Sequence, residues 1–199
     1  MDIKKVNEMY IVEKKEGALD TFTKDFLKEL TDINIPYVLI SGYIAILFGR
    51  NRSSEDIDIL IPPITEEEFN TMWEQLNKKY ECLNTTHKKE AYKEYLKEGV
   101  AIRFATKGTI IPNMELKTSK TSLEKWALKN RQQVQVNNNQ IYISPIELQI
   151  AYKAYLGSEK DIEDAIFLQE LFKEEMNQEQ LHYFLKGLQV KKIYEEQIK

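Results

Sequence analysis

Several kinds of residue and segment are scarce in this chain, and each scarcity excludes a class of protein. The 199 residues include one cysteine, Cys82, which excludes an internal disulfide and a zinc cluster built from cysteines. Uninterrupted apolar runs stay well short of the ~20 residues that a membrane-spanning helix needs. The first residues also lack the basic-then-apolar order of a secretory signal. Together these absences predict a cytoplasmic protein with no membrane segment.

An excess of charge of one sign is also absent. The chain has 28 Lys and Arg against 32 Asp and Glu, a formal net charge of −4. This balance argues against a protein that coats nucleic acid, although it is compatible with a local basic groove. Hydrophobic residues make up 42% and charged residues 30%, which is typical of a soluble protein with a substantial core.

The most informative pattern lies in the first third of the chain. Val38–Ile40 is a short apolar run typical of a buried strand, and Ser41 and Gly42 follow it where a helix is predicted to begin. A second predicted strand carries Asp56 and Asp58. Because strand side chains alternate between faces, these two carboxylates project together while the isoleucines between and after them point into a core. Neighbouring carboxylates repel each other, and a divalent metal ion is the usual reason for keeping them together.

The rest of the chain alternates between predicted helices and strands. Residues 1–17 are weakly patterned and favour a short strand or an ordered arm. Helices are expected at 19–33, 43–48, 65–80, 91–96, 121–129, 144–156, 159–172 and 178–187, and strands at 38–40, 56–61, 100–105, 110–118, 134–136 and 141–143. Ser144-Pro145 is a typical helix start, with serine as the cap and proline in the first turn.

This order predicts an α/β (α+β) fold in two parts. Residues 1–143 would form a small mixed sheet with flanking helices, and residues 144–199 a helical C-terminal subdomain. Backbone N–H groups at a helix start attract phosphate, and a small residue lets the phosphate approach closely. A phosphate cradle beside paired carboxylates indicates nucleotidyl transfer, although Asp-x-Asp also occurs on ordinary exposed strands and Ser-Gly in ordinary tight turns.

The stretch SGYIAILFGRNRSSEDIDI resembles the DNA polymerase beta-like nucleotidyltransferase superfamily, in which a pair of small residues precedes Asp-x-Asp. It looks most like the AbiEii-like nucleotidyltransferase toxins, and is similar also to small-molecule (aminoglycoside or lincosamide) nucleotidyltransferases. SPIELQIAYKAYLGSEKDIEDA in the helical part resembles the helices of the toxin-like proteins as well. The resemblance covers most of residues 35–170 and implies the nucleotidyltransferase fold.

The resemblance also implies roles for individual residues. Asp56 and Asp58 would bind Mg²⁺, with two ions expected, and Glu115 on a later strand would be the third ligand or the base for the attacking hydroxyl. The residues expected to contact the nucleotide come from both parts of the chain: Ser41, Gly42, Arg52, Ser54, Lys153 and Lys160. By sequence alone, Arg52, Ser54 and Glu115 are equally compatible with ordinary solvated side chains. Lys160, Asp161 and Asp164 could likewise form surface ion pairs.

The expected activity is Mg²⁺-dependent transfer of a nucleoside monophosphate from an NTP to an acceptor hydroxyl, with release of pyrophosphate. The resemblance to toxins implies an RNA end, such as that of tRNA, or a protein side chain as acceptor, and a cognate antitoxin as partner. Two alternatives remain open. One is transfer to a small molecule such as an antibiotic, and the other is a non-catalytic nucleotide-binding or toxin–antitoxin interaction protein.

Overall fold

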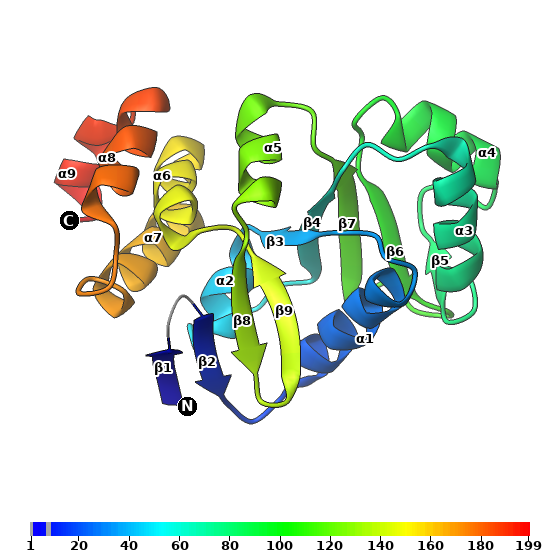
Figure 1. The fold of residues 1–199 in the computed structure, drawn as a ribbon, viewed down its shortest axis with the longest axis horizontal. Coiled ribbons are helices and arrows are strands. Elements are labelled where there is room, and N and C mark those ends of the chain that lie inside the picture. The colour runs from blue at the N-terminus through cyan, green and yellow to red at the C-terminus, as the bar shows by residue number, and fades with distance from the viewer. Residues whose placement is uncertain (1, 7–8) are drawn as a thin grey trace.

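The structure, a computed structural model, describes residues 2–6 and 9–199 (Figure 1). Its described strands form one mixed sheet of nine strands in the order β1-β2-β8-β9-β3-β4-β7-β6-β5. The strands are β1 (Asp2–Val6), β2 (Met9–Glu13), β3 (Val38–Ile40), β4 (Asp56–Ile61), β5 (Tyr80–Cys82), β6 (Ile102–Thr106), β7 (Asn113–Thr118), β8 (Gln132–Val136) and β9 (Asn139–Ile143).

The described helices alternate with these strands and then follow them, as Figure 1 shows. They are α1 (Ala18–Asp32), α2 (Gly42–Leu47), α3 (Glu66–Leu76), α4 (Lys88–Glu90), the π-helix η1 (Ala91–Leu96), α5 (Ser122–Lys129), α6 (Ile146–Leu156), α7 (Glu159–Leu171), α8 (Gln178–Gly187) and α9 (Lys191–Gln197). None of these helices has the length and apolar character needed to cross a membrane. The mixed α/β class predicted from the sequence is confirmed.

β4 is an interior strand of the sheet and pairs antiparallel with β3 and parallel with β7. Its alternation is the predicted one: Ile57, Ile59 and Ile61 are fully buried, while Asp56 is exposed and Asp58 is half-buried. The isoleucine face packs on the apolar sides of α1 and α3, where the ring of Phe104 on β6 lies 5.8 Å from that of Trp73. The two aspartates therefore face away from this core.

The sheet is larger than predicted because the start of the chain adds a hairpin to it. β1 and β2 pair antiparallel, and β2 then pairs in parallel with β8. The sequence signal is weak because Tyr10 and Val12 are the only residues of this hairpin with buried side chains among those described. The prediction for residues 1–17 also includes residues 1, 7 and 8, which lie outside the described part of the chain.

Several predicted boundaries differ from the structure, and two of them differ by three or more residues. The helix expected to reach residue 80 ends at Leu76, because Tyr80 instead begins β5 and packs its ring 4.9 Å from Phe26 on α1. The strand expected from Ile110 begins at Asn113, after Pro112, whose missing N–H cannot continue a strand ladder.

The start of α6 also differs from the prediction. Pro145, and not Ser144, is the N-cap residue, and no side chain caps the helix. Proline disfavours the helical conformation in the residue that precedes it, so Ser144 stays outside the helix. Its backbone N–H donates to the Leu39 carbonyl oxygen at 2.9 Å, next to the pairing of β9 with β3. The Ser144 hydroxyl is therefore not used as a cap.

The C-terminal helices pack directly against the N-terminal part of the chain. Phe172, which follows α7, is almost completely buried, and its ring lies 4.9 Å from Tyr10 on β2 and 4.8 Å from Phe48 at the end of α2. The predicted boundary between residues 143 and 144 falls between β9 and α6. This aromatic cluster joins residues from both sides of that boundary.

We expect Phe172→Ala to lower the free energy of unfolding by about 3–5 kcal/mol, because it leaves a cavity among three packed rings. Tyr183→Ala is the control, since Tyr183 is 71% exposed and its loss should change stability by no more than about 0.5 kcal/mol. Urea unfolding followed by circular dichroism and by tryptophan fluorescence measures both. Coincident transitions are expected in the wild type; two separated transitions would contradict packing of the two parts into one cooperative unit.

Candidate active site

Three carboxylates lie on one face of two neighbouring interior strands of the sheet. Asp56 and Asp58 come from β4, and Glu115 on β7 is aligned with Asp58 in the parallel register. Side chains aligned in this way project from the same face of a sheet. The exposed fraction of the side chain is 21% for Asp58 and 9% for Glu115. The structure thus brings the three predicted acidic residues to one place.

Two basic residues lie beside these carboxylates. Lys117 Nζ is 3.7 Å from Asp58 Oδ1 and 3.8 Å from Glu115 Oε2. Arg103 on β6 donates from Nε to Glu115 Oε1 at 2.6 Å. Glu115 is therefore held by Arg103 and Lys117. In residues 2–6 and 9–199, no cluster of three or more His, Cys, Asp or Glu side chains is arranged to hold a metal ion.

The negative charge of Asp58 is only partly compensated by the basic side chain beside it. Burial raises the pKa of Asp58 above its usual value; Lys117 opposes this increase, and repulsion from Glu115 and Asp56 adds to it. A hydrogen bond with the Ser41 side chain also opposes the increase in pKa. A divalent cation between the two aspartates would relieve both the repulsion and the cost of burial.

The donor atoms available at this face fit a hard cation. Asn113 on β7 is aligned with Asp56. Its side-chain Oδ1 is buried and has no hydrogen-bond partner within the described part of the chain. Carboxylate and amide oxygens are the protein ligands that Mg²⁺ prefers. Asp56, Asp58 and Asn113 therefore form an all-oxygen set that suits Mg²⁺.

The turn that joins β3 to α2 has an unusual backbone. Ser41 has φ 66° and ψ −144°, a conformation that residues with a side chain rarely adopt and that tends to occur at functional sites. Its backbone N–H donates to Gln149 Oε1 on α6 at 3.1 Å. At the next residue, Gly42, an added Cβ would lie 2.9 Å from Arg52 Nη1. Glycine at this position therefore allows the Arg52 guanidinium group to pack against the start of α2.

Arg52 is held by a buried network of charges. Asp164 on α7 has no exposed surface and accepts hydrogen bonds from both Arg50 and Arg52. Lys153 on α6 is 1% exposed; its Nζ lies 2.6 Å from Asp164 Oδ2 and 3.1 Å from Asp161 Oδ1. Asp164, which by sequence could have been a surface residue, is thus the centre of the network. Lys153 has protein carboxylates as its partners.

The other two predicted contact residues lie at the edges of this arrangement. Ser54 donates from Oγ to the backbone oxygen of Asp56 at 3.0 Å and to its Oδ1 at 3.2 Å. Ser54 therefore orients the first aspartate. Lys160 on α7 is exposed, and its backbone oxygen accepts a hydrogen bond from Arg50 Nη1 at 3.1 Å.

A cavity of 310 Å³ opens on the same face of the sheet as the carboxylates. Ile40 and Leu60 line its sheet side, and both are neighbours of Asp58: Ile40 is aligned with Asp58 across β3 and β4, and Leu60 lies two residues along β4. Residues of α5 and α6 line the opposite side, among them Tyr152. Burial raises the pKa of Tyr152; Glu124, Tyr155 and Asp58 add to this increase, and Lys117 opposes it.

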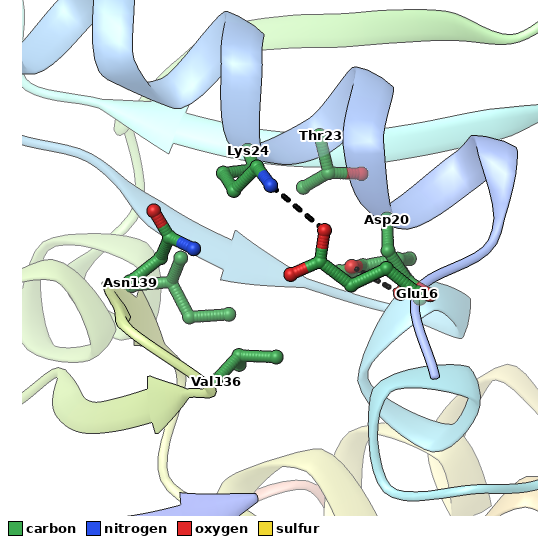
Figure 2. A pocket seen from close by; sticks show the side chains of 8 residues that line it. Glu16, Asp20, Thr23, Lys24, Val136 and Asn139 are labelled. Carbon is green, nitrogen blue, oxygen red and sulfur yellow. Dashed lines mark hydrogen bonds and ion pairs between the residues drawn. The ribbon is translucent and has the colours of Figure 1, made fainter. Parts of the chain in front are cut away.

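A second hollow, of 10 Å³, lies between α1, α2 and the β8–β9 hairpin (Figure 2). Its polar groups are paired: Lys24 Nζ lies 2.7 Å from Glu16 Oε2, and Asp20 Oδ1 accepts from Tyr43 Oη at 2.9 Å. A hollow of this size holds no more than a water molecule. The hydrogen bond between Asp20 and Tyr43 joins α1 to α2, and the ion pair joins α1 to the segment before it. The hollow is not a candidate for the substrate site.

Sequence reasoning missed the polar residues that complete the site: Asn113, Lys117, Arg103, Ser144 and Gln149. A signal existed for Asn113 and Lys117, because each lies two residues from Glu115 and so shares its strand face. The position of Arg103 depends on the register between β6 and β7, and that of Gln149 on how α6 packs against the turn at Ser41. Neither of these pairings leaves a pattern in a single sequence.

Comparison with known proteins supports the fold. An antigenic nucleotidyltransferase-like protein from Paracoccidioides brasiliensis matches 89% of this chain and 90% of its own at 18% identity, with a TM-score of 0.56. The antibiotic-resistance factor ANT(2″)-Ia matches 88% of this chain and 94% of its own at 13% identity, with a TM-score of 0.53. No family model and no curated protein sequence matches the chain. The chain therefore has the nucleotidyltransferase fold, and identities this low establish the fold alone.

The buried network around Asp164 predicts a large loss of stability when its charge is removed. Asp164→Asn leaves Arg50, Arg52 and Lys153 without their shared partner, and we expect it to lower the free energy of unfolding by about 3–5 kcal/mol. Glu163→Gln is the matched control. Glu163 also pairs with Arg50, but its side chain is 53% exposed, and its loss should cost no more than about 1 kcal/mol. Equal effects of the two substitutions in urea unfolding would contradict the central role of Asp164.

Proposed function

We propose that the protein is a Mg²⁺-dependent nucleotidyltransferase that moves a nucleoside monophosphate from an NTP to an acceptor hydroxyl. The observation that carries this proposal is the set of three carboxylates, Asp56, Asp58 and Glu115, on one sheet face beside the turn at Ser41 and Gly42. The nucleotidyltransferase fold supports it. So does the resemblance of the same residues to the nucleotidyltransferase motif.

In the proposed reaction the acceptor oxygen attacks the α-phosphorus, the bond from that phosphorus to the bridging oxygen of the β-phosphate breaks, and pyrophosphate leaves. Asp56 and Asp58 would hold Mg²⁺, with Asn113 beside them. When bound, the ion neutralises charge on the phosphates and polarises the attacking oxygen. Glu115 takes the proton of the acceptor hydroxyl, and Lys117 stabilises the negative charge shared by Glu115 and Asp58.

The triphosphate would lie against the turn at the start of α2. The Gly42 N–H and the Arg52 guanidinium group are the donors proposed to contact it, because arginine has five N–H donors and its bond to Asp164 leaves others for a ligand. Lys160 is an exposed cation that could reach the phosphates from α7. Lys153 is proposed to act through Asp164, by fixing the carboxylate that holds Arg52.

The acceptor is the part of the reaction on which the two sources of similarity differ. The resemblance to AbiEii-like toxins favours an RNA end or a protein side chain as acceptor, with an antitoxin as partner. ANT(2″)-Ia was solved in complex with adenylyl-2″-tobramycin, at 14% identity to this chain and a TM-score of 0.54. This neighbour makes a small-molecule antibiotic the second candidate. A non-catalytic nucleotide-binding or antitoxin-binding protein is the third, and it would show no turnover.

Removing either aspartate should abolish transfer. We expect Asp56→Asn and Asp58→Asn each to lower the rate by about 1000-fold or more, because metal-ligand carboxylates account for several kcal/mol of transition-state stabilisation. The assay combines α-labelled NTPs and Mg²⁺ with total RNA, cell extract or aminoglycosides, and follows labelled product and pyrophosphate. Asp32→Asn, an exposed carboxylate on α1, is the control and should react like the wild type. Equal labelling by wild type and Asp58→Asn would exclude the proposed enzyme.

A separate substitution tests Glu115 as the proton acceptor. Glu115→Gln keeps the size of the side chain but cannot take up a proton, so kcat should fall by about 10²–10⁴-fold while KM for the NTP stays close to the wild-type value. Steady-state kinetics over a range of pH measures this. An unchanged kcat would remove Glu115 from the reaction and leave it as the partner of Arg103.

A further inference from the structure

The 310 Å³ cavity is adjacent to the carboxylates, but most of the residues that line it are aliphatic or aromatic. Its sheet side is formed by Ile40 and Leu60, and residues two apart on a strand lie only about 7 Å apart on the same face. A ligand whose reacting phosphate lies at Asp58 can therefore place an uncharged group in the cavity. The volume is near the lower limit of small-molecule sites, which suits one ring system and not a whole nucleotide.

The lining of the cavity suits a flat, uncharged group. Tyr152 and Tyr155 on α6 line it, and their ring centroids are 5.8 Å apart. Both rings retain substantial exposure, at 37% and 56%. Glu124 is the acidic side chain in the lining, and its Oε2 already accepts hydrogen bonds from the backbone N–H of Thr121 and the Thr121 hydroxyl. The acidic side chain of the lining is thus bound through Oε2 to the start of α5, and the two tyrosines supply aromatic surface on which a planar ring can stack.

Ser144 supplies a second and independent sign of a ligand. Its side chain lines the cavity and is 0% exposed, yet Oγ has no hydrogen-bond partner among the residues that the structure describes. A buried hydroxyl without a partner costs stability, and no hydrogen bond among the described residues offsets that cost here. A hydrogen-bonding ring edge in the cavity would satisfy it.

Gln149 connects this cavity to the turn at Ser41 and Gly42. It lines the cavity, and its Oε1 accepts a hydrogen bond from the backbone N–H of Ser41, which follows Ile40, the residue aligned with Asp58 across β3 and β4. Ser41 lines the cavity too. The donor nucleotide is the substrate whose triphosphate must lie at this turn. Its base, and not the acceptor, is therefore the ring that continues from the turn into the cavity.

We propose that the cavity binds the base of the donor NTP, that Ser144 is a specificity-determining residue for that base, and that Gln149 is a positioning residue which ties the base site to the turn at Ser41. This inference rests on the proposed function, because it places the triphosphate at Asp56, Asp58 and the turn. It predicts that base and triphosphate contribute separately to binding and that different residues control the two contributions.

The test measures dissociation constants with Mg²⁺ for ATP, GTP, CTP, UTP and the baseless analogue ribose 5′-triphosphate. The wild type should bind its preferred NTP at least tenfold more tightly than the analogue. Tyr152→Ala should weaken all four NTPs about tenfold, because it removes a stacking surface, and leave the analogue unchanged. Ser144→Ala should reduce the preference between bases about tenfold, again without an effect on the analogue.

Two further measurements separate these roles from general structural damage. Ser144→Ala should unfold at the same or a higher urea concentration than the wild type, because it removes an unsatisfied hydroxyl. Gln149→Met keeps the side-chain length but loses the bond to Ser41, so it should weaken ribose 5′-triphosphate as well as the NTPs. Tyr183→Ala, an exposed tyrosine on α8 outside the cavity, is the control and should bind all five ligands like the wild type.

Equal affinity of the wild type for the NTPs and the baseless analogue would overturn the inference and leave the proposed function intact. So would cavity substitutions that leave NTP binding unchanged and raise KM for the acceptor, because the acceptor would then occupy the cavity. If neither the NTPs nor ribose 5′-triphosphate bind, the proposed function fails, and the base site fails with it.

Discussion

The site depends above all on the register between two parallel strands. β4 and β7 pair so that Asp56, Asp58 and Leu60 are aligned with Asn113, Glu115 and Lys117. Because side chains alternate along a strand, a slip of one residue in either strand would move its polar set into the isoleucine core. The core therefore specifies the register and the register assembles the charges. Burial of the apolar residues thus keeps the mutually repelling carboxylates on one face of the sheet, with Arg103 and Lys117 beside them.

A second constraint orients the turn against these strands. α2 has six residues and is too short to hold its own position, so its ends are tied to other elements. At its start, Ser41 is held by Gln149; beyond its end, Arg50 and Arg52 are held by Asp164. Both ties come from the C-terminal helices. The helical part thus supplies both contacts that hold the turn, and these contacts cross the predicted boundary between residues 143 and 144.

The sequence predicts those parts of the structure that rest on local patterns. The strands at Val38–Ile40 and Asp56–Ile61, the helices around them and the shared face of the two aspartates follow from periodicity, and the structure confirms them. The features that the sequence does not predict depend on pairing between distant segments. The β1–β2 hairpin buries too few side chains to leave a pattern, and the charge partners of Lys153 become visible only when α6 and α7 pack together.

At Ser144, which lines the proposed base site, a local rule for predicting helix caps fails. Serine before proline is a good helix cap by sequence, yet here α6 starts one residue later than such a cap would require, and the hydroxyl is left buried without a partner among the described residues. An unsatisfied hydroxyl is destabilising, and folding alone gives no reason to keep it. Its position in a cavity whose sheet side borders Asp58 supplies the reason, since a bound ring can make the hydrogen bond that the fold omits. The unsatisfied Ser144 hydroxyl would then account both for specificity toward that ring and for a small loss of stability.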